Sequence, residues 1–376
     1  MKKKILVVFG TRPEAVKMAP VVSALRLHSQ HVDLKVCVTA QHREMLDQVL
    51  DFFEIVPDFD LDLMRDSPDL YQLTADVLQG MKAVLQQFQP DRVLVHGDTT
   101  TSAIAALAAF YAQIPVGHVE AGLRTYDRYA PFPEEINRQL TGRLANLHFA
   151  PTAFAKENLI SEKVPEANIY VTGNTVIDAL IWAKERLTGY SDDEIRRLES
   201  IVDMKKKLVL VTAHRRENQG EGLVSICDAI RRIAINEAVE VVFPVHLNPR
   251  VRGPVHKLLD GVPNIKLVAP LGYPAFAWLM IQSYMIITDS GGIQEEAPGL
   301  GKPVLVMREV TERPEAVDAG AVKLVGADAN RIVGEAEVLL HDTAAYHRMS
   351  QAINPYGDGK SALRIAEILL DDPSFA

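Results

Sequence analysis

The feature that most constrains this chain is the alternation of short apolar runs with helix-like stretches along its 376 residues. Six runs in the first half lie at residues 4–9, 34–39, 92–96, 116–120, 147–150 and 169–172. Six more in the second half lie at 208–212, 240–245, 265–268, 285–288, 304–307 and 322–325. Most are continuously apolar, as expected for strands covered by helices on both faces. The pattern predicts an α/β protein with two doubly wound parallel sheets, each in a Rossmann-like domain.

The domain boundaries follow from the connection between the two sets of runs. A charged helical segment at 178–207 leads from the first set to the second. We expect an N-terminal domain at 1–172, a C-terminal domain at 173–358, and a final helix at 359–376 that packs back on the N-terminal domain. The last helix is expected to be amphipathic, with one side formed by Leu363, Ile365, Ile368 and Leu369.

The composition excludes several classes of partner. The net charge of −9 predicts no broad attraction to nucleic acid or to an anionic membrane surface. The apolar run near the N-terminus is short and no cleavage site follows it, which is unlike a secretory signal. Cys37 and Cys227 lie inside apolar runs, and we expect them to be buried free thiols. These features predict a cytoplasmic protein.

Polar residues gather where the predicted strands end. The runs are followed by "GTRPEA", "HGDTTT", "EAGLRTYDRYAPFPEEINR", "TAHRREN", "PVHLNP", "TDSGGIQEE" and "REVTERPE". Ligands of α/β proteins bind outside the carboxyl ends of the strands. Seven polar clusters at such ends predict a polar cleft between the two sheets.

The segment "TDSGGIQEE" is the strongest local signal. Ser290 is placed to cap a helix, and Gly291 and Gly292 allow main-chain N–H groups to approach an anion. Glu295 and Glu296 lie one turn further, where a carboxylate can accept hydrogen bonds from two ribose hydroxyls. The alternative is an ordinary capped helix with acidic residues near its start.

Asp98 and Glu120 each end an apolar strand, where an unpaired carboxylate is costly to desolvate. They are candidates for acid and base chemistry. The structural alternatives are that Asp98 caps the following helix and that Glu120 forms an ion pair with Arg124.

The remaining candidates also have structural alternatives. Arg12 follows the first strand and precedes a proline-initiated helix, and it could simply be solvated. Glu134 and Glu135 begin a helix, where they could only be stabilising its dipole. His214 follows a strand, as His246 does less distinctively, and either could be structural.

Several cofactor motifs are absent from the sequence. There is no G-x-G-x-x-G, and "GLGKPV" has proline where a P-loop needs serine or threonine. There is also no C-x-x-C and no H-E-x-x-H. We therefore expect neither a nicotinamide cofactor nor a metal ion.

Many of these segments together resemble one family. "FGTRPEAVKMAP", "VLVHGDTTT", "GHVEAGLRT", "PEEINRQLTG", "VTGNTVIDAL", "TAHRREN", "TDSGGIQEEAP" and "TERPEAV" look like the non-hydrolysing UDP-N-acetylglucosamine 2-epimerases of bacteria, in the same order over nearly the whole chain. The resemblance implies a glycosyltransferase-B-type fold, a homodimer, and interconversion of UDP-GlcNAc and UDP-ManNAc without a cofactor.

The resemblance also implies roles for individual residues. The implied catalytic residues are Asp98, Glu120, Glu134 and His214. The implied substrate-binding residues are Arg12, Lys17, Phe276, Ser290, Gly291, Gly292, Glu296 and Arg313. Some relatives bind a second UDP-GlcNAc as an activator, and the corresponding positions are Gln41, His42 and His246.

The chemistry of such a reaction fits the charged residues found. Inversion at C2 without an oxidant requires a base, an acid on the other face of the sugar, and stabilisation of a departing diphosphate. Three alternatives remain open from the sequence: a glycosyltransferase of the same architecture, a hydrolysing epimerase that releases free ManNAc, and a catalytically silent sensor of UDP-sugars. The three carboxylates favour the non-hydrolysing epimerase over the glycosyltransferase.

Overall fold

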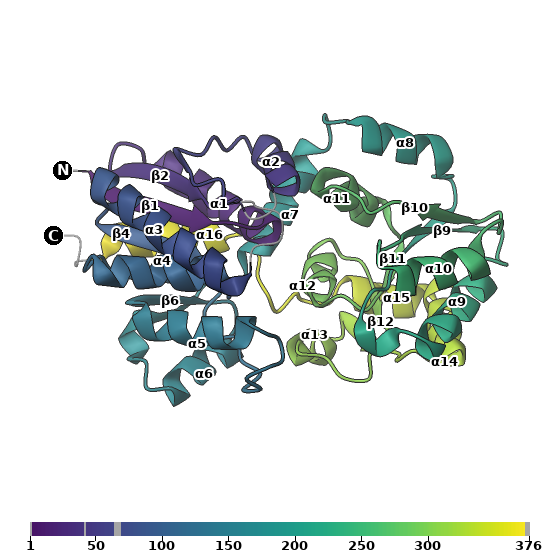
Figure 1. Cartoon of the computed structure of the whole chain (residues 1–376). Coiled ribbons are helices and arrows are strands. Elements are labelled where there is room, and N and C mark those ends of the chain that lie inside the picture. Colours follow the sequence, from purple (N-terminus) through teal and green to yellow (C-terminus); the bar gives the residue numbers. More distant parts are fainter. Residues whose placement is uncertain (1, 41–42, 64–68, 373–376) are drawn as a thin grey trace. The chain divides into compact units, whose positions relative to one another are not determined.

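The computed structural model describes residues 2–40, 43–63 and 69–372. The chain forms two compact units, Met1–Ala179 together with Tyr356–Ala376, and Leu180–Pro355. Each unit is built on a parallel β-sheet flanked by helices (Figure 1). The predicted fold class, α/β with two Rossmann-like units, is confirmed.

The sheet of the first unit has the strand order β3-β2-β1-β4-β5-β6-β7. Its strands are β1 (Lys3–Phe9), β2 (Val32–Val38), β3 (Phe59–Asp60), β4 (Arg92–His96), β5 (Val116–Val119), β6 (Leu147–Ala150) and β7 (Ile169–Val171). Every pairing is parallel; Ile5, for example, pairs with Leu34 on one side and Arg92 on the other. Six of these strands were predicted. The prediction missed β3, because two residues are too few to form a recognisable apolar run.

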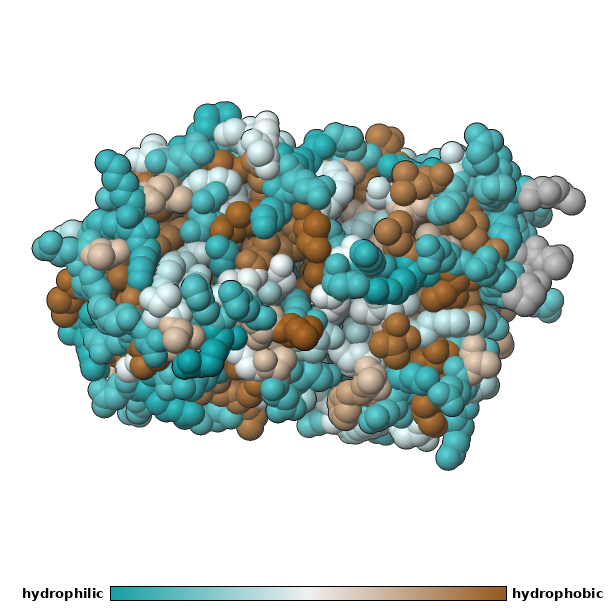
Figure 2. Space-filling model, turned by 180° about the vertical axis from the view of Figure 1, so that it is seen from behind, coloured by the Kyte–Doolittle hydropathy of each residue, from teal (hydrophilic) through white to brown (hydrophobic). Residues whose placement is uncertain are grey.

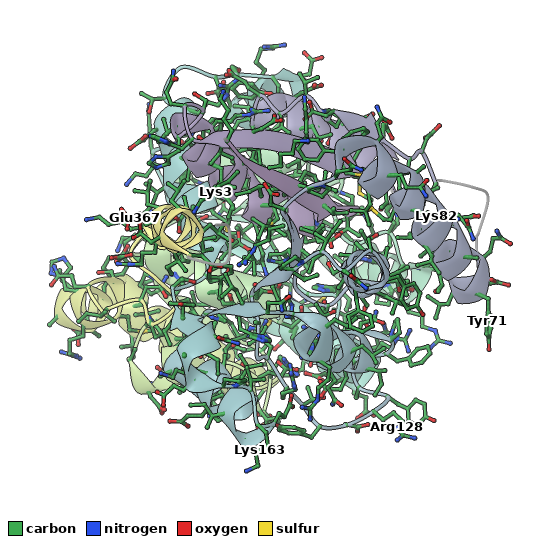
Figure 3. All side chains as sticks on the ribbon, turned by 90° about the vertical axis from the view of Figure 1, so that its left-hand side faces the viewer. Lys3, Tyr71, Lys82, Arg128, Lys163 and Glu367 are labelled. Carbon is green, nitrogen blue, oxygen red and sulfur yellow. The ribbon has the colours of Figure 1, made fainter. Side chains whose placement is uncertain are left out.

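Two groups of helices pack against this sheet. One contains α1 (Arg12–Leu27), α2 (Arg43–Phe52) and α16 (Ser361–Asp371), and the other contains α3 (Leu70–Phe88), α4 (Thr100–Tyr111) and α5 (Glu134–Leu144). In Figure 3, Glu367 of α16 and Lys82 of α3 lie on opposite sides of the sheet. The unit is completed by α6 (Ala153–Ser161) and a short 3₁₀ turn, η1 (Glu166–Asn168).

The last helix, α16, packs on α1. The Lys3 ammonium donates a hydrogen bond to the carbonyl of Leu369 near the helix end, which suits the negative end of the helix dipole. Ile365 and Leu369 are completely buried, as the apolar pattern suggested. Leu363 was placed on the same side, but it is 43% exposed. The pattern was wrong there because the buried face is completed by the small residues Ala362 and Ala366.

The sheet of the second unit has the order β10-β9-β8-β11-β12-β13. Its strands are β8 (Lys207–Thr212), β9 (Val239–Pro244), β10 (Ile265–Val268), β11 (Met285–Thr288), β12 (Val304–Val306) and β13 (Val322–Leu324). All six were predicted. A buried core joins β8, β9 and β11 to helices on one face of the sheet, including α9 and α14.

The second unit is reached through α7 (Thr175–Arg186), which begins in the first unit. The predicted helical segment 178–207 contains two helices, because the helix is interrupted between α7 and α8 (Asp193–Ile201). The other helices are α9 (Glu221–Ile233), α10 (Pro249–Leu259), α11 (Tyr273–Gln282), α12 (Gly291–Gly299), α13 (Pro314–Asp318), α14 (Ala329–His341), α15 (Thr343–Ser350) and the 3₁₀ turn η2 (Arg216–Asn218).

The surface and the thiols agree with the composition. Figure 2 shows a face on which hydrophilic side chains surround small, separate hydrophobic patches. In the part of the chain that is described, no helix is both long and apolar enough to cross a membrane. Cys37 and Cys227 are buried free thiols, as predicted. Burial raises the pKa of both thiols to about 12, so neither is reactive at neutral pH.

Candidate active site

Each sheet has one point where the strand order reverses, and α/β proteins bind ligands there. In the first unit this point lies between β1 and β4, and in the second between β8 and β11. Arg12 and Asp98 follow β1 and β4, while His214 and Ser290 follow β8 and β11. These four sequence-predicted residues therefore lie at the switch points of the two sheets.

The β1–α1 turn contains a carboxylate of the chain itself. Glu14 Oε2 accepts hydrogen bonds from the main-chain N–H groups of Gly10 (3.0 Å) and Thr11 (2.8 Å). Its Oε1 accepts from the hydroxyls of Thr99 (2.6 Å) and Ser102 (2.9 Å). Many α/β proteins use such N–H groups to hold phosphate. Here Glu14 is 2% exposed and already occupies that place, while Arg12 begins α1 beside it.

Glu120 is the centre of a charged cluster in the first unit. Its Oε2 forms an ion pair with Lys17, accepts a hydrogen bond from Asn174 Nδ2 (2.8 Å) and lies 3.8 Å from His96 Nε2. Burial opposes ionisation of Glu120, but Lys17, His96 and Asn174 outweigh it and hold the pKa of Glu120 well below its usual range. The alternative partner, Arg124, pairs instead with Glu162 (Nε to Oε1, 2.7 Å).

The backbone at Glu120 has φ of 61°, in the left-handed region that a glutamate rarely adopts. Such backbone strain is held only where the surroundings impose it, and it recurs at functional sites. Here it directs the side chain, directly after β5, toward Lys17.

Asp98 differs from Glu120 in its electrostatics. Its Oδ2 accepts a hydrogen bond from Arg138 (2.7 Å), and its side chain is 28% exposed. Burial raises the pKa of Asp98 to about 6; Arg138 opposes this shift and the nearby Glu120 adds to it. Asp98 does not cap the next helix, since Thr99 does so by accepting from Ser102 N. A carboxyl group that titrates near neutrality is suited to proton transfer.

The two glutamates at the start of α5 have different surroundings. Glu135 is completely buried and accepts hydrogen bonds from the main-chain N–H groups of Thr125 (3.0 Å) and Tyr126 (3.1 Å). It therefore fixes the preceding loop. Glu134 is half-buried at the first position of α5, and its charge contributes to raising the pKa of Asp98. Of the two, Glu134 is the one whose charge acts on the pKa of Asp98.

In the second unit, His214 is held by an aspartate that the sequence analysis did not select. His214 Nδ1 lies 3.2 Å from Asp289 Oδ1, and Asp289 Oδ2 accepts from the main-chain N–H of His214 (2.9 Å) and Arg215 (2.8 Å). Burial opposes ionisation of Asp289, but these hydrogen bonds lower its pKa. The carboxylate fixes the ring through Nδ1, so Nε2 is the nitrogen left for other chemistry.

His246 lies against the same histidine. The rings of His214 and His246 stack, with centroids 5.7 Å apart and planes at 16°. The main-chain N–H of Asn248 donates to His246 Nδ1 (3.1 Å) and orients that ring. One residue expected in catalysis and one expected in activation are thus in direct contact.

The start of α12 has the features of an anion site. Ser290 occupies the N-cap position, as predicted, but its side chain makes no capping hydrogen bond. The Arg313 guanidinium packs over Gly291, where a Cβ atom would lie 3.1 Å from Cζ. Gly291 and Gly292 open the helix, so their N–H groups belong to its positive end. Two sources of positive potential, the helix start and Arg313, therefore meet at one place.

The two glutamates of α12 are also distinct. Glu295 is 4% exposed and accepts from Arg313 Nε (2.7 Å). Glu296 is half-buried and faces α11, where burial and then the charge of Glu296 raise the pKa of Tyr273. Phe276 lies on α11 as well and is partly exposed. The engagement of Glu295 with Arg313 is consistent with Glu296 being the ribose ligand.

Two of the expected activator residues, Gln41 and His42, lie outside the described residues. Among the residues that are described, no group of three or more His, Cys, Asp and Glu side chains is arranged to hold a metal ion.

The chain was compared with known proteins. Residues 25–370 match the family described as UDP-N-acetylglucosamine 2-epimerase. Two curated enzymes of that name, from Salmonella typhimurium and Campylobacter jejuni, are 56% and 55% identical; the alignments cover 97% and 98% of this chain and 98% of each relative. The crystal structure of UDP-GlcNAc 2-epimerase from Neisseria meningitidis bound to UDP-GlcNAc superposes with a TM-score of 0.89 at 50% identity, covering 98% of this chain and 100% of that one.

This chain belongs to the UDP-N-acetylglucosamine 2-epimerase family. The resemblance found in the sequence is thereby confirmed, and with it the glycosyltransferase-B-like fold of the epimerase family. The structure of UDP-GlcNAc 2-epimerase from Methanocaldococcus jannaschii has a TM-score of 0.85 at 34% identity, covering 97% of this chain and 99% of that one. The epimerase fold is therefore retained at considerable sequence distance.

Proposed function

We propose that this epimerase interconverts UDP-GlcNAc and UDP-ManNAc by eliminating UDP and adding it back. A base removes the proton from C2, the C1–O bond breaks with its electron pair going to UDP, and 2-acetamidoglucal remains. A proton is then delivered to C2 from the opposite face, and a UDP oxygen attacks C1. The proposal is supported by family membership and by carboxylates with opposite electrostatic settings.

The observation that carries the proposal is the contrast between Asp98 and Glu120. Asp98, whose pKa is raised to about 6, can both accept and return a proton near neutral pH. Glu120 is kept ionised by Lys17. We assign proton transfer on one face of C2 to Asp98, and to Glu120 the stabilisation of positive charge that develops at C1 as the bond to UDP breaks. Glu134 is proposed as the second acid or base, which transfers the proton on the opposite face of C2.

The diphosphate is assigned to the second unit. The start of α12 with Gly291 and Gly292, together with Arg313, would hold phosphate oxygens, because helix N–H groups and guanidinium groups favour anions. His214, oriented by Asp289, would stabilise the charge of the leaving group. Glu296 is proposed to bind the ribose hydroxyls.

The other proposed contacts rest on the family resemblance. Phe276 is assigned to the uracil region, and Arg12 and Lys17 to the nucleotide side of the substrate. The ion pair of Lys17 with Glu120 adds a second task for this lysine, which is to keep that carboxylate ionised. A cytoplasmic homodimer is proposed on the same basis.

The test is to incubate the protein with UDP-GlcNAc alone in D₂O and to follow the sugar by NMR. We expect UDP-ManNAc to appear and deuterium to enter C2 of both epimers without added NAD or metal, because the proton removed from C2 exchanges with solvent at the carboxyl group. Free ManNAc would instead indicate the hydrolysing reaction. Substrate recovered without deuterium and without epimer would contradict the proposal.

Activation by a second UDP-GlcNAc is proposed for the site that includes Gln41, His42 and His246. The stacking of His246 on His214 offers a direct route by which occupancy at one ring would change the position of the other. When the reaction starts from UDP-ManNAc, its rate should then increase as UDP-GlcNAc forms and binds the activator site. The dependence of the rate on concentration should therefore not be hyperbolic. Strictly hyperbolic kinetics would contradict activation.

A further inference from the structure

One buried asparagine joins the Glu120 cluster to the start of α7. Asn174 is 2% exposed, and the two ends of its side-chain amide have separate partners. Oδ1 accepts a hydrogen bond from the main-chain N–H of Val176 (3.1 Å), while Nδ2 donates to Glu120 Oε2 (2.8 Å). Because Val176 N–H can only donate, the amide oxygen must face it, and the amide nitrogen must therefore face Glu120.

The main chain around Asn174 is also held firmly. Its N–H donates to the carbonyl of Tyr356 (2.6 Å), on the segment by which the chain returns to the first unit. Nearby, Ala362 N donates to Asp178 Oδ1 (2.8 Å), and Arg364 donates to the carbonyl of Thr172 (3.2 Å). Asn174 thus stands where the chain leaves and re-enters the first unit, and it cannot turn without breaking several hydrogen bonds.

The contacts of Glu120 are divided unequally between its two oxygens. Lys17 and Asn174 both donate to Oε2. Within the described residues, no hydrogen bond reaches Oε1, and a Cβ atom built on Gly97 would lie 3.6 Å from it. A carboxylate anchored through one oxygen presents the other in a fixed direction.

We propose that Asn174 is a positioning residue that anchors Oε2 of Glu120 and so presents Oε1 to the substrate. Its side chain also caps α7, the helix that continues into the second unit, so one amide fixes both the helix start and the carboxylate. The importance of Oε1 for turnover rests on the proposed function, whereas the anchoring of Oε2 does not.

The sharpest test is Asn174→Asp. Aspartate caps helices as well as asparagine does, so the bond from Val176 N–H is kept. The donor to Glu120 is replaced by a second carboxylate, which favours the protonated form of Glu120. We expect kcat to fall about 10- to 100-fold with little change in KM. The pKa of Glu120, followed by a carboxyl ¹³C NMR titration without substrate, should rise by about one unit. This titration is the readout because the acid limb of the kcat–pH profile is assigned to Asp98.

Asn174→Ser and Asp328→Asn complete the set. Serine keeps a capping oxygen but removes the donor without adding charge, so kcat should fall while the pKa of Glu120 rises less than in Asn174→Asp. Asp328 caps α14 by accepting a hydrogen bond from Arg331 N (2.8 Å). Asp328→Asn is the control, because it exchanges aspartate and asparagine at a helix cap to which no functional role is assigned. It should retain wild-type kinetics. All three variants should unfold within a few degrees of the wild type.

Two results would overturn the proposal. One is a wild-type kcat together with a wild-type pKa of Glu120 in Asn174→Asp. The other is an equal loss of kcat in Asn174→Asp and Asn174→Ser with no change in the pKa of Glu120, which would indicate a structural role only. The ¹³C NMR titration is independent of the proposed reaction, because Asn174→Asp should raise the pKa of Glu120 even if that reaction is wrong. Failure of the wild type to epimerise would contradict the proposed function alone.

Discussion

At the scale of single residues, neighbouring carboxylates have been given different tasks by their partners. Glu14 and Glu135 are buried acceptors of main-chain N–H groups and hold turns in place. Glu120 is kept ionised by Lys17, while Asp98 has its pKa raised to about 6. Within one unit, the same functional group therefore occurs as a buried acceptor of main-chain N–H groups, as an ion-paired carboxylate and as a carboxyl group with a pKa near neutrality.

The role of Arg138 can be tested through the pH dependence of turnover. Arg138 lowers the pKa of Asp98 against the effect of burial, so Arg138→Gln should raise that pKa above its present value of about 6. If Asp98 must be ionised to remove the C2 proton, activity is lost as pH falls through this pKa. The acid limb of kcat should then move to higher pH by about one unit, as measured by initial rates between pH 5 and 9.

Arg143→Gln is the matched control, since Arg143 is exposed on the same helix. It should leave the profile unchanged. An acid limb that stays in place in Arg138→Gln would exclude Asp98 as the ionised base.

The sequence points to single residues more readily than to their partners. Asp98, Glu120 and His214 were selected because polar residues that end buried strands are conspicuous, and Glu134 was selected because it begins a helix after two prolines. Asp289 was missed although it directly follows β11, because the adjacent "SGG" drew attention to the helix start. Asn174 was missed because its partner is 54 positions away in the sequence. Spacing along the chain carries no information about such pairs.

At the scale of elements, the turn between β1 and α1 is the most unusual feature. Glu14 satisfies the N–H groups of Gly10 and Thr11 that would otherwise be unpaired at the helix start. It also joins this turn to α4 through Thr99 and Ser102. The turn therefore contributes rigidity between β1 and β4, on which Asp98 depends.

Replacing Glu14 should accordingly cost stability. Glu14→Ala removes this acceptor from two main-chain N–H groups and from the hydroxyls of Thr11, Thr99 and Ser102, and we expect the free energy of unfolding to fall by about 2–4 kcal/mol. Glu14→Gln keeps one acceptor oxygen and should lose less. Urea unfolding measures both.

Glu157→Ala on α6 is the reference, because Glu157 is exposed. A surface change of this kind is expected to stay within about 0.5 kcal/mol of the wild type. A Glu14→Ala loss of that small size would mean that water replaces the carboxylate in the turn at little cost.

Elements were predicted well where they are long and apolar. The continuous runs gave twelve strands correctly, whereas β3, with two residues, has no recognisable pattern. The side of α16 was predicted in part: Leu363 is exposed because alanines complete the buried face. Packing against α1 decides that face, and it is not encoded in the helix alone.

At the scale of the whole molecule, ionisable groups are distributed unevenly between the two units. His96, His118 and His148 lie on β4, β5 and β6 of the first unit. Burial lowers the pKa of these histidines to about 4, 3 and 4 respectively. The core of the first unit therefore contains three histidines that are neutral at neutral pH.

Acid should consequently weaken the first unit. Below about pH 6.5 the unfolded chain takes up protons at these histidines, while the folded chain does so only near their lowered pKa values. The free energy of unfolding should fall by on the order of a few kcal/mol between pH 6.5 and 4. Hydrogen exchange of the β4–β6 amides measures this loss, while fluorescence of Trp182 and Trp278 reports the second unit, which contains both.

His118→Gln separates this effect from general acid denaturation. His118 Nε2 lies 2.7 Å from the carbonyl of Gly97, and a glutamine amide can donate the same hydrogen bond without binding a proton. The variant should lose less stability between pH 6.5 and 4 than the wild type. An unchanged dependence on pH would contradict the assignment to this histidine.

The sequence led to both units and their topology, because each sheet is formed from its own consecutive set of apolar runs. The cleft expected between the units stays a prediction. So do the boundaries at 172/173 and 358/359; by contacts, the chain passes between the units at Ala179–Leu180 and at Pro355–Tyr356. Such a division depends on which contacts a crossing segment makes, and local composition does not contain that information.

The return of the chain to the first unit has a consequence for synthesis on the ribosome. The second unit is one continuous stretch, Leu180–Pro355, and all of it is translated before α16. The first unit, although most of it precedes the second, lacks α16 until the second unit has been translated. Until then the apolar surface of α1 that α16 covers stays open to solvent or to chaperones. The half that is translated first is thus the half that is completed last.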